Sequence, residues 1–497
     1  MSIVPSTGYS PNHLSPAYNP IIWSVLSSES SYTNMRYVFD IYLDADATKT
    51  VRIKQRPNPA GYGMLDISSI IQSYLDYSEP TAAITNGETT IDYASGKIYQ
   101  SNPFLSRSVT IKVGEELDGI IYTGSGSVGE PSYILYSGNT TDSKLAVKVW
   151  PASLSDHEQQ WHMQKVTASG VFGGNPFMRD SIGAIKNFDF GIGLSYPLSF
   201  DSLHRSVYTF DKCTLSFINF TPYLEPEFRR IYGFRILIKD SSANTVHTED
   251  VPMITANGYA QRALSTTSNP STASQYDIVH VLASPNDLLE AIGETNNHPL
   301  SAGMQIWITG HKQASVGSAT FGAAITQTIK LTIKEYCSDP LYQRVRLSWL
   351  NTLGGRDYLN FTAFTEKTIS TKSEEFFNEQ MNWSGQVPVA VNADSYLIGR
   401  LGIAGGFKPY NKQVTTVYDI ESDWLTQEQV NLLEGLQKSP QVLAYIHDED
   451  NTLSDYYAYT VRIKDSSYSS RNVRQAKLVQ GKFKIELVMP QKIQTTY

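Results

Sequence analysis

Three short stretches of the sequence carry residue types that bind metal ions. Residues 157–162 are HEQQWH, close to the H-E-x-x-H pattern of zinc metalloproteases. Because these histidines are five residues apart, a helix would place them about 140° apart, and they would not share one metal ion. Asp44 and Asp46, and the run HDEDN at 447–451, carry clustered carboxylates of the kind that hold calcium. Neither has the glycine and terminal glutamate of an EF-hand loop, so we interpret both as solvated turns and predict no metal site.

The sequence also lacks the common catalytic and phosphate-binding motifs. It has no G-x-S-x-G, no P-loop and no complete G-x-G-x-x-G that opens a helix, since GIGLSY at 191–196 stops short of the last pattern. Glycosidases use two carboxylates defined by their separation in space, so a count of 48 acidic residues identifies no such pair. Arg229, Arg230 and Arg235 are clustered, but without a surrounding basic excess they indicate a solvated sheet face. We therefore predict no catalytic residue, no cofactor and no enzyme activity.

The composition indicates a large β-rich protein made in a reducing compartment. A chain of 497 residues is expected to form about two to four domains. The 31 Tyr residues suit half-buried strands, and a net charge of -8 gives no overall basic footprint for nucleic acid. Cys213 and Cys337 have no paired spacing that would suggest a disulfide or a zinc site. The chain has neither a secretion-signal pattern nor the ~20 consecutive apolar residues of a membrane span.

Alternation of apolar and polar residues predicts many short strands. Residues 36–54 have this pattern on either side of a polar turn and predict a hairpin. Similar runs occur at 234–240, 276–282, 304–310, 328–336, 345–350, 442–446, 457–465 and 482–488. Short strands separated by turn residues are typical of β-sandwich or barrel-like domains. We predict a mainly β protein of several such domains, with a few short amphipathic helices packed on the sheets.

Helical periodicity interrupts the strand pattern at three places. The first predicted helix spans 66–76, with Asp66 as N-cap and an apolar stripe of Ile67, Ile70, Ile71, Tyr74 and Leu75. Before it, Pro57 and Pro59 end a strand and Gly61 and Gly63 turn the chain.

The second predicted helix follows Ser284 as N-cap, begins with Pro285 and stops at Gly293. The third spans 426–437, with Thr426 in a capping box and Pro440 as terminator.

Shifts in composition suggest four segments. We predict an extended N-terminal arm at 1–20, a β-sandwich domain at 21–130, a central β-rich domain at 131–336 and a C-terminal β-rich domain at 337–497. Glycines at 170–195 predict a long loop inside the central domain.

In the C-terminal segment, Gly354 and Gly355 predict a tight hairpin turn, in which Asp357 bonds to local backbone amides. The favoured interpretation of this turn is structural, and a ligand-binding turn is the alternative.

Five stretches resemble one protein family. They are SPAYNPI at 15–21, RPNPAGYGMLDISSIIQSYLD at 56–76, RLSWLNTLGGRDYLNFT at 346–362, WLTQEQVNLLEGLQKSPQV at 424–442 and KLVQGKFKIELV at 477–488. In this order they resemble virion proteins of tailed phages that infect Bacteroidota, and are similar to tail and neck ring proteins of crAss-like podophages. The residues that mark the resemblance are Pro57, Pro59, Gly61, Gly63, Asp66, Ile71, Trp349, Gly354, Gly355, Asp357, Trp424 and Pro440.

The resemblance implies a structural component of a virion, made in the cytoplasm of the host bacterium. Copies would form part of a homo-oligomeric ring in the tail or neck, with sixfold or twelvefold symmetry, beside other tail and neck proteins. DNA would pass through as cargo without specific binding, which a negative lumen would favour. Two other classes stay open: a tail-fibre or host-receptor module that binds glycans, and, less favoured, a tail-borne glycan depolymerase or peptidoglycan hydrolase with carboxylates about 5 to 10 Å apart.

Overall fold

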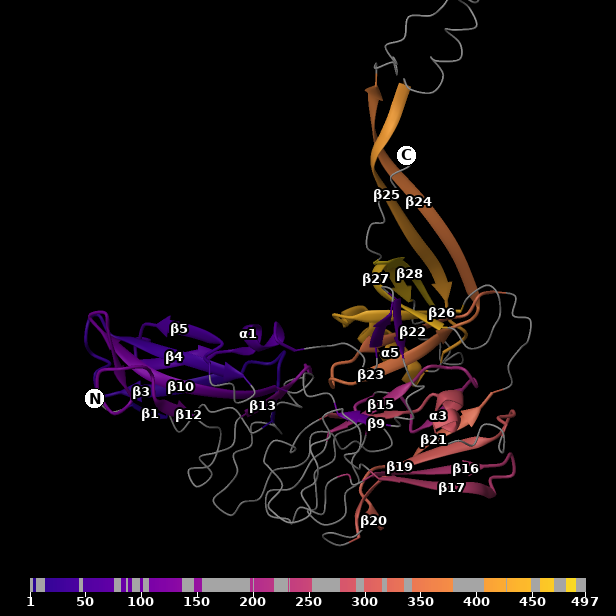
Figure 1. Ribbon diagram of the computed structural model, residues 1–497, viewed down its shortest axis with the longest axis horizontal. Coiled ribbons are helices and arrows are strands. Elements are labelled where there is room, and N and C mark those ends of the chain that lie inside the picture. Colours follow the sequence, from indigo (N-terminus) through magenta and orange to yellow (C-terminus); the bar gives the residue numbers. More distant parts are fainter. Residues whose placement is uncertain are drawn as a thin grey trace, which may run out of the picture.

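The computed structural model describes most of the strand-forming segments of the chain. The described residues are 3–5, 14–43, 48–75, 82–85, 88–91, 99–101, 107–135, 147–153, 197–199, 201–218, 231, 233–252, 278–291, 299–314, 320–334, 342–378, 406–425, 427–447, 456–468 and 480–488. Within them the chain forms five sheets and three short helices (Figure 1). This confirms the predicted mainly β fold with several sheets and few helices.

The first sandwich consists of two sheets that share one core. Its smaller sheet has the order β1 (Ile3–Pro5), β3 (Ile22–Ser27), β6 (Tyr62–Asp66). Its larger sheet has the order β2 (Leu14–Pro16), β13 (Val147–Trp150), β10 (Arg107–Leu117), β4 (Arg36–Leu43), β5 (Val51–Gln55), and β10 also pairs with β11 (Ile120–Thr123) and β12 (Tyr133–Leu135). The predicted hairpin at 36–54 is confirmed, with Tyr37 opposite Gln55.

Apolar side chains from both sheets and from helix α1 (Ser68–Gln72) meet between the layers of this sandwich. Trp23, Phe39 and Ile71 are buried there, one from each sheet and one from the helix. Residues 3–5 and 14–16, which we predicted as parts of an extended arm, are extended strands that pair with β3 and β13 of the same chain.

A second two-layer unit follows. Its larger sheet has the order β14 (His204–Val207), β21 (Ile329–Ile333), β19 (Gln305–Gln313), β16 (Gly233–Lys239), β17 (Thr245–Pro252), with β20 (Phe321–Ala324) beside β19. Its smaller sheet has the order β15 (Thr214–Ile218), β18 (Ile278–Leu282), β9 (Tyr99–Ser101). Helix α3 (Pro285–Ala291) adds Leu288 and Leu289 to the same core.

The largest sheet has nine strands, and two of them, β22 (Val345–Leu350) and β23 (Arg356–Phe361), are buried on both faces. Its order is β23, β22, β26 (Val442–His447), β27 (Tyr456–Tyr468), β28 (Gly481–Leu487), β25 (Gly406–Glu421), β24 (Phe364–Asn378), and β7 (Ala82–Thr85) and β8 (Glu88–Ile91) attach at β27. Trp349 and Leu433 of helix α5 (Gln427–Lys438) share one core, whereas Tyr358 and Tyr445 belong to the core of the second unit.

Strands from early in the sequence cross between these units. Thr89 of β8 lies opposite Ala458, and Gln100 of β9 lies opposite His280, so these two early strands pair with the later sheets. Conversely, β13 lies beyond residue 130 and completes a sheet of the first sandwich. The predicted domain boundaries stay predictions.

The three helices differ from their predicted bounds in instructive ways. Helix α1 is five residues long rather than the predicted span of 66–76, and its N-cap is Ile67 rather than Asp66. Asp66 instead ends β6, and its carboxylate accepts hydrogen bonds from the backbone N–H groups of Ser68 (2.9 Å) and Ile21 (3.0 Å). Tyr74 and Leu75, both predicted in the buried stripe, lie beyond the end of the helix; Tyr74 is 37% exposed and Leu75 is buried.

Helix α3 begins at Pro285 as predicted, but the Ser284 hydroxyl does not cap it. That hydroxyl accepts a hydrogen bond from the Cys213 backbone N–H (2.8 Å) and donates to the Cys213 carbonyl (3.2 Å). Helix α5 spans nearly the predicted residues, and Pro440 follows its end by two residues.

The two longest strands, β24 and β25, were not predicted. They form a two-stranded ribbon that extends well beyond the other strands of the nine-stranded sheet (Figure 1). Residues 366–375 are all exposed, so this stretch has no buried face to impose an apolar alternation on its sequence.

Several sequence predictions fall on residues outside the described part of the chain. These are the stretches at 157–162, 170–195 and 191–196, together with Asp44, Asp46, Arg229, Arg230, Gly293, Cys337, Thr426 and the segment 448–451. Arg235 is described, and its guanidinium forms a bidentate pair with Asp250 at 2.6 and 2.7 Å.

Candidate functional site

Half of the residues that mark the family resemblance are buried at packed joints, and Pro59, Asp66, Trp424 and Pro440 are exposed. Pro57 and Pro59 follow β5, which ends at Gln55, and the turn after them leads into β6. At this turn Gly61 has a φ of +85°. The Tyr37 hydroxyl donates to the Gly61 carbonyl (2.7 Å) and accepts from the Ser27 backbone N–H (2.9 Å), and burial raises the pKa of Tyr37 to about 12.

Gly63 lies directly against the same tyrosine ring. A Cβ at this position would come within 2.5 Å of the Tyr37 ring, so only glycine allows this approach. The stretch PNPAGYG therefore packs against one buried tyrosine of the sandwich. Ile71 of the following helix is buried in the same core.

A second joint is built by the turn between β22 and β23. The Asn351 side-chain carbonyl accepts hydrogen bonds from the backbone N–H groups of Leu353 (2.9 Å) and Gly355 (3.2 Å), and its amide donates to the Leu198 carbonyl (2.9 Å). Gly354 has a φ of +82°, as the predicted hairpin turn requires. The residue that holds the turn amides is thus Asn351, which corrects the role predicted for Asp357.

Both glycines of this turn are in close contact with distant segments of the chain. A Cβ at Gly354 would lie 2.6 Å from the Trp150 ring, and a Cβ at Gly355 would overlap the Leu198 carbonyl oxygen. The Trp150 indole N–H also donates to the Leu353 carbonyl (2.9 Å). The turn therefore fixes the end of the first sandwich and the segment around Leu198 against the nine-stranded sheet.

Asp357 is the second residue of β23 and is only 1% exposed. The Ser199 hydroxyl donates to its carboxylate at 2.5 Å, and the Arg205 guanidinium donates to the Ser199 hydroxyl at 2.9 Å. Burial raises the pKa of Asp357 to about 6, against the Ser199 hydrogen bond and the positive charge of Arg205, which lower it. The carboxylate thus links the nine-stranded sheet to the start of the second unit.

Further along β22 and β23, polar side chains bind the loop before β15. The Arg346 guanidinium donates to the Lys212 carbonyl (2.7 Å) and pairs with Asp211 (3.2 Å). The Tyr358 hydroxyl accepts a hydrogen bond from the Thr214 backbone N–H (3.1 Å) and forms another with the Thr214 hydroxyl (2.7 Å). We name Asn351, Gly354, Gly355, Asp357 and these contacts the junction.

The remaining marker residues lie around helix α5. Trp349 is fully buried, and a Cβ added at Gly435 would lie 3.2 Å from its indole nitrogen, so the helix packs closely over this ring. Pro440 separates α5 from β26. Trp424 differs from the others, because its side chain is 65% exposed.

The chemistry available at the junction is limited by its burial. Asn351, Asp357, Ser199 and Arg205 are each less than one-tenth exposed, so their polar groups are not available to a substrate from solvent. In the part of the chain that the structure describes, no group of three His, Cys, Asp or Glu side chains is arranged to hold a metal ion. The same residues include no helix with the length and apolar character to cross a bilayer.

No protein-family model and no curated protein sequence matches this chain.

Sequence reasoning found the turn but missed the residues that it binds. Ser199, Asp211 and Thr214 lie in stretches without a motif, and each binds a side chain more than 100 residues away in the chain. Arg205 reaches the site through Ser199, six residues before it. One sequence signal pointed to these contacts. Arg346 and Ser348 occupy alternate positions of the strand VRLSWL, and both lie on its second face, which is buried like the first.

Proposed function

We propose that this protein is a structural component of a tailed-phage virion, and that its copies form part of a ring in the tail or neck. The observation that supports this most is the position of the residues that mark the resemblance. Six of the twelve are buried, and Gly63, Gly355 and Asp357 among them lie where separate sheets or segments meet. A protein selected for assembly needs such fixed joints between units, because its neighbours must meet it in one geometry.

The exposed ribbon supports the same proposal from the other direction. Two long strands without a packed face add no core to a protein that acts alone. In a protein that contacts neighbours, they extend the surface available for those contacts. DNA would be cargo that passes the ring, and other tail and neck proteins would cover its remaining surfaces. We further propose that the protein acts in the virion after synthesis in the bacterial cytoplasm, and that it is not an enzyme.

Cryo-electron microscopy of the virion tests this proposal. We expect density for this chain in a ring around the DNA path of the tail or neck, repeated by rotational symmetry. Density at the tip of a fibre, or no copy of the chain in the particle, would reject the ring.

One observation favours the alternative of a glycan-binding module. Trp424 exposes an indole face in the segment before α5, and sugars stack their apolar faces on such rings. A glycan array probed with the full chain, with Trp424→Ala as the comparison, would detect this activity. Binding that is lost with Trp424 would move the protein to the receptor-binding class, and no binding by either chain would leave the ring as the proposal.

A further inference from the structure

The outer part of the ribbon is an exposed edge. β24 and β25 pair from Phe364 opposite Glu421 to Asn378 opposite Gly406, while β28 pairs with β25 only over Val417–Glu421. Within the described residues β24 has β25 as its one neighbour, so its other edge presents unpaired backbone groups. An isolated two-stranded ribbon is marginally stable in water, and a third strand along that edge would stabilise it.

The order of side chains along β24 is self-complementary. Ile369 is 60% exposed, Glu366 lies three residues before it and Lys372 three residues after it. The register with β25 is regular from Phe364 to Lys372, and the one irregularity comes after this window. Neither Glu366 nor Lys372 forms an ion pair with another described residue.

An antiparallel partner strand of the same sequence would match this order. If two copies of β24 align with Ile369 opposite Ile369, each Glu366 lies opposite Lys372 of the other copy, and Thr368 lies opposite Ser370. Directly opposed residues share one face of a sheet, so the two ion pairs form on one face and the isoleucine pair on the other.

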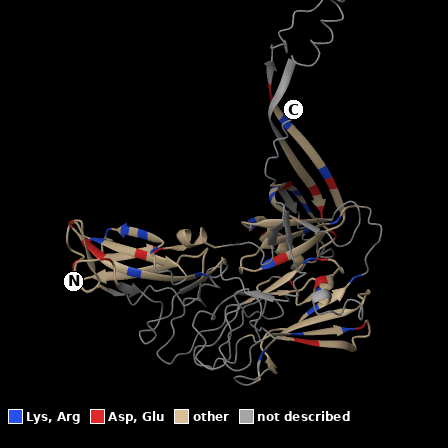
Figure 2. Cartoon of the chain, in the orientation of Figure 1, with Lys and Arg blue, Asp and Glu red and all other residues tan. Residues whose placement is uncertain are grey.

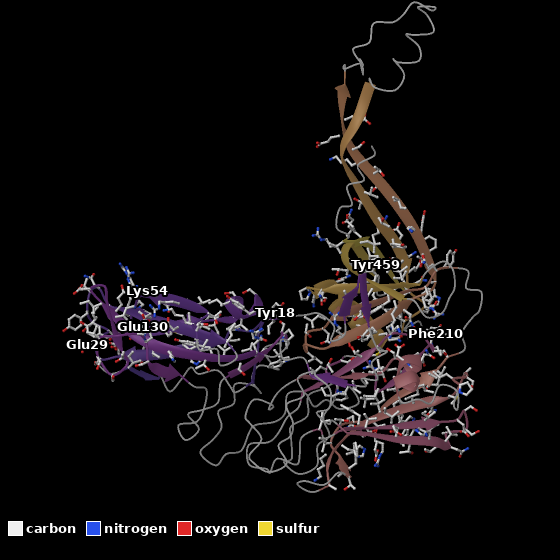
Figure 3. All side chains as sticks on the ribbon, in the orientation of Figure 1. Tyr18, Glu29, Lys54, Glu130, Phe210 and Tyr459 are labelled. Atoms are coloured by element: carbon white, nitrogen blue, oxygen red, sulfur yellow. The ribbon has the colours of Figure 1, made fainter. Side chains whose placement is uncertain are left out.

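The second strand of the ribbon extends the apolar face. Ile369 lies opposite Thr416 and Thr371 lies opposite Val414, which makes Val414 a diagonal neighbour of Ile369 on the same face. Val414 is 56% exposed in the single chain. In the paired arrangement two valines and two isoleucines would form one row across four strands. Figure 2 shows both acidic and basic residues along the ribbon, and its side chains extend into open space in Figure 3.

We propose that the free edge of β24 pairs with the same edge of a second copy of this chain, around a two-fold axis at Ile369. The contact is isologous, because both copies use the same surface. It goes beyond the proposed ring, whose contacts around the circle are heterologous. The two-fold contact joins two single chains or, if the copies also form rings, two rings face to face.

Charge reversal in the full-length chain tests this pairing. Glu366→Lys brings cations opposite each other at two places in the homodimer, and Lys372→Glu does the same with anions. Each variant alone should lose about tenfold or more in dimer affinity in sedimentation equilibrium. When the two variants are mixed, each reversed charge meets its complement, and a mixed dimer should form with an affinity close to that of the wild type.

The matched control is Glu375→Lys, which reverses a charge on the same exposed strand. In the proposed register Glu375 lies opposite Ala363, so this variant should dimerise like the wild type. Circular dichroism checks that each variant is folded, and if one of the two reversals fails to fold, the other still tests the pairing alone. Equal weakening by Glu366→Lys and Glu375→Lys would overturn the register.

A cysteine at the axis gives a second, independent readout. Ile369→Cys places two thiols opposite each other, and mild oxidation should link two chains covalently, whereas Thr415→Cys on the inner strand should not link them. Two results would overturn the proposal. One is a wild-type protein whose mass in solution never exceeds that of a single chain, and the other is a dimer affinity that neither charge reversal weakens. Neither result would bear on whether the chain lies in a virion ring, which the particle image decides separately.

Discussion

The strands β23 and β24 are separated by two residues in the chain but lie in opposite surroundings. β23 carries Asp357 and Tyr358, which bind segments more than 100 residues away in the buried junction. β24 carries Ile369 in an exposed ribbon. The side chains of the first strand pack against other parts of the same chain, whereas those of the second are exposed and available to a partner. Stability should therefore depend on the junction, and association on the ribbon.

The largest loss of stability is expected from Gly355→Ala. The added methyl group would overlap the Leu198 carbonyl oxygen, so backbone must move and about 3 kcal/mol or more of unfolding free energy should be lost. Urea denaturation followed by tryptophan fluorescence measures it.

Gly119→Ala is the control for this change. Unlike Gly355, Gly119 has a positive φ of +87°, but nothing lies within 4 Å of an added Cβ, so its substitution should cost only the backbone strain of about 1 kcal/mol. Equal losses for the two variants would show that the junction is not tightly packed.

A pH-dependent effect of intermediate size is expected at Asp357. Its pKa is raised from 3.8 to about 6 in the folded chain, so the folded state binds a proton more tightly than the unfolded state. The stability that this proton contributes is complete below pH 4 and is lost as the pH rises to 6, a change of about 2–3 kcal/mol at most.

Asp357→Asn removes this titration and can still accept a hydrogen bond from Ser199. Relative to the wild type, the variant should gain stability steadily between pH 4 and pH 6, as measured by denaturant midpoints at each pH. Parallel pH profiles for the two proteins would contradict the buried carboxyl group.

A smaller effect is expected from Tyr358→Phe. This change removes the hydroxyl that accepts the Thr214 backbone N–H in a buried setting, at a cost of about 1–2 kcal/mol. Tyr459→Phe is a suitable comparison, since Tyr459 is only partly buried, at the edge of the core that contains Trp349 and Leu433 (Figure 3). Hydrogen exchange of the Thr214 amide should accelerate only in the first variant.

The smallest effect on stability is expected in the ribbon. Ile369→Thr keeps a β-branched side chain on an exposed strand, and it should change the unfolding free energy by less than about 0.5 kcal/mol. The same change should weaken the dimer by removing both central side chains. If this substitution destabilised the single chain as much as Tyr358→Phe, the division of roles between junction and ribbon would be wrong.

Local patterns in the sequence predicted local structure well. Strand alternation located β16, β19 and β21, because one side of each faces a core. Pro285 marked the start of α3, and Gly354 marked a turn that needs a positive φ. In each case the chemistry of neighbouring residues is sufficient to set the conformation.

Two features could not be predicted, for different physical reasons. The partners of Asp357 lie far away in the chain, and no pattern near Ser199 indicates which strand will bury it. The ribbon escaped because residues 366–375 have no buried face, so their order reflects solvent and a partner rather than a core. Sequence patterns thus indicate packing within a chain more readily than packing between chains.

Hydrogen exchange followed by mass spectrometry tests the central claim most directly, with the full-length chain compared in its dissociated and associated states. Amides of residues 356–361 should exchange slowly in both states, because the junction is complete in one chain. Amides of residues 366–372 should exchange fast in the dissociated chain and become protected on association. Fast exchange at the junction in the single chain, or a ribbon that stays unprotected in the associated state, would contradict the account.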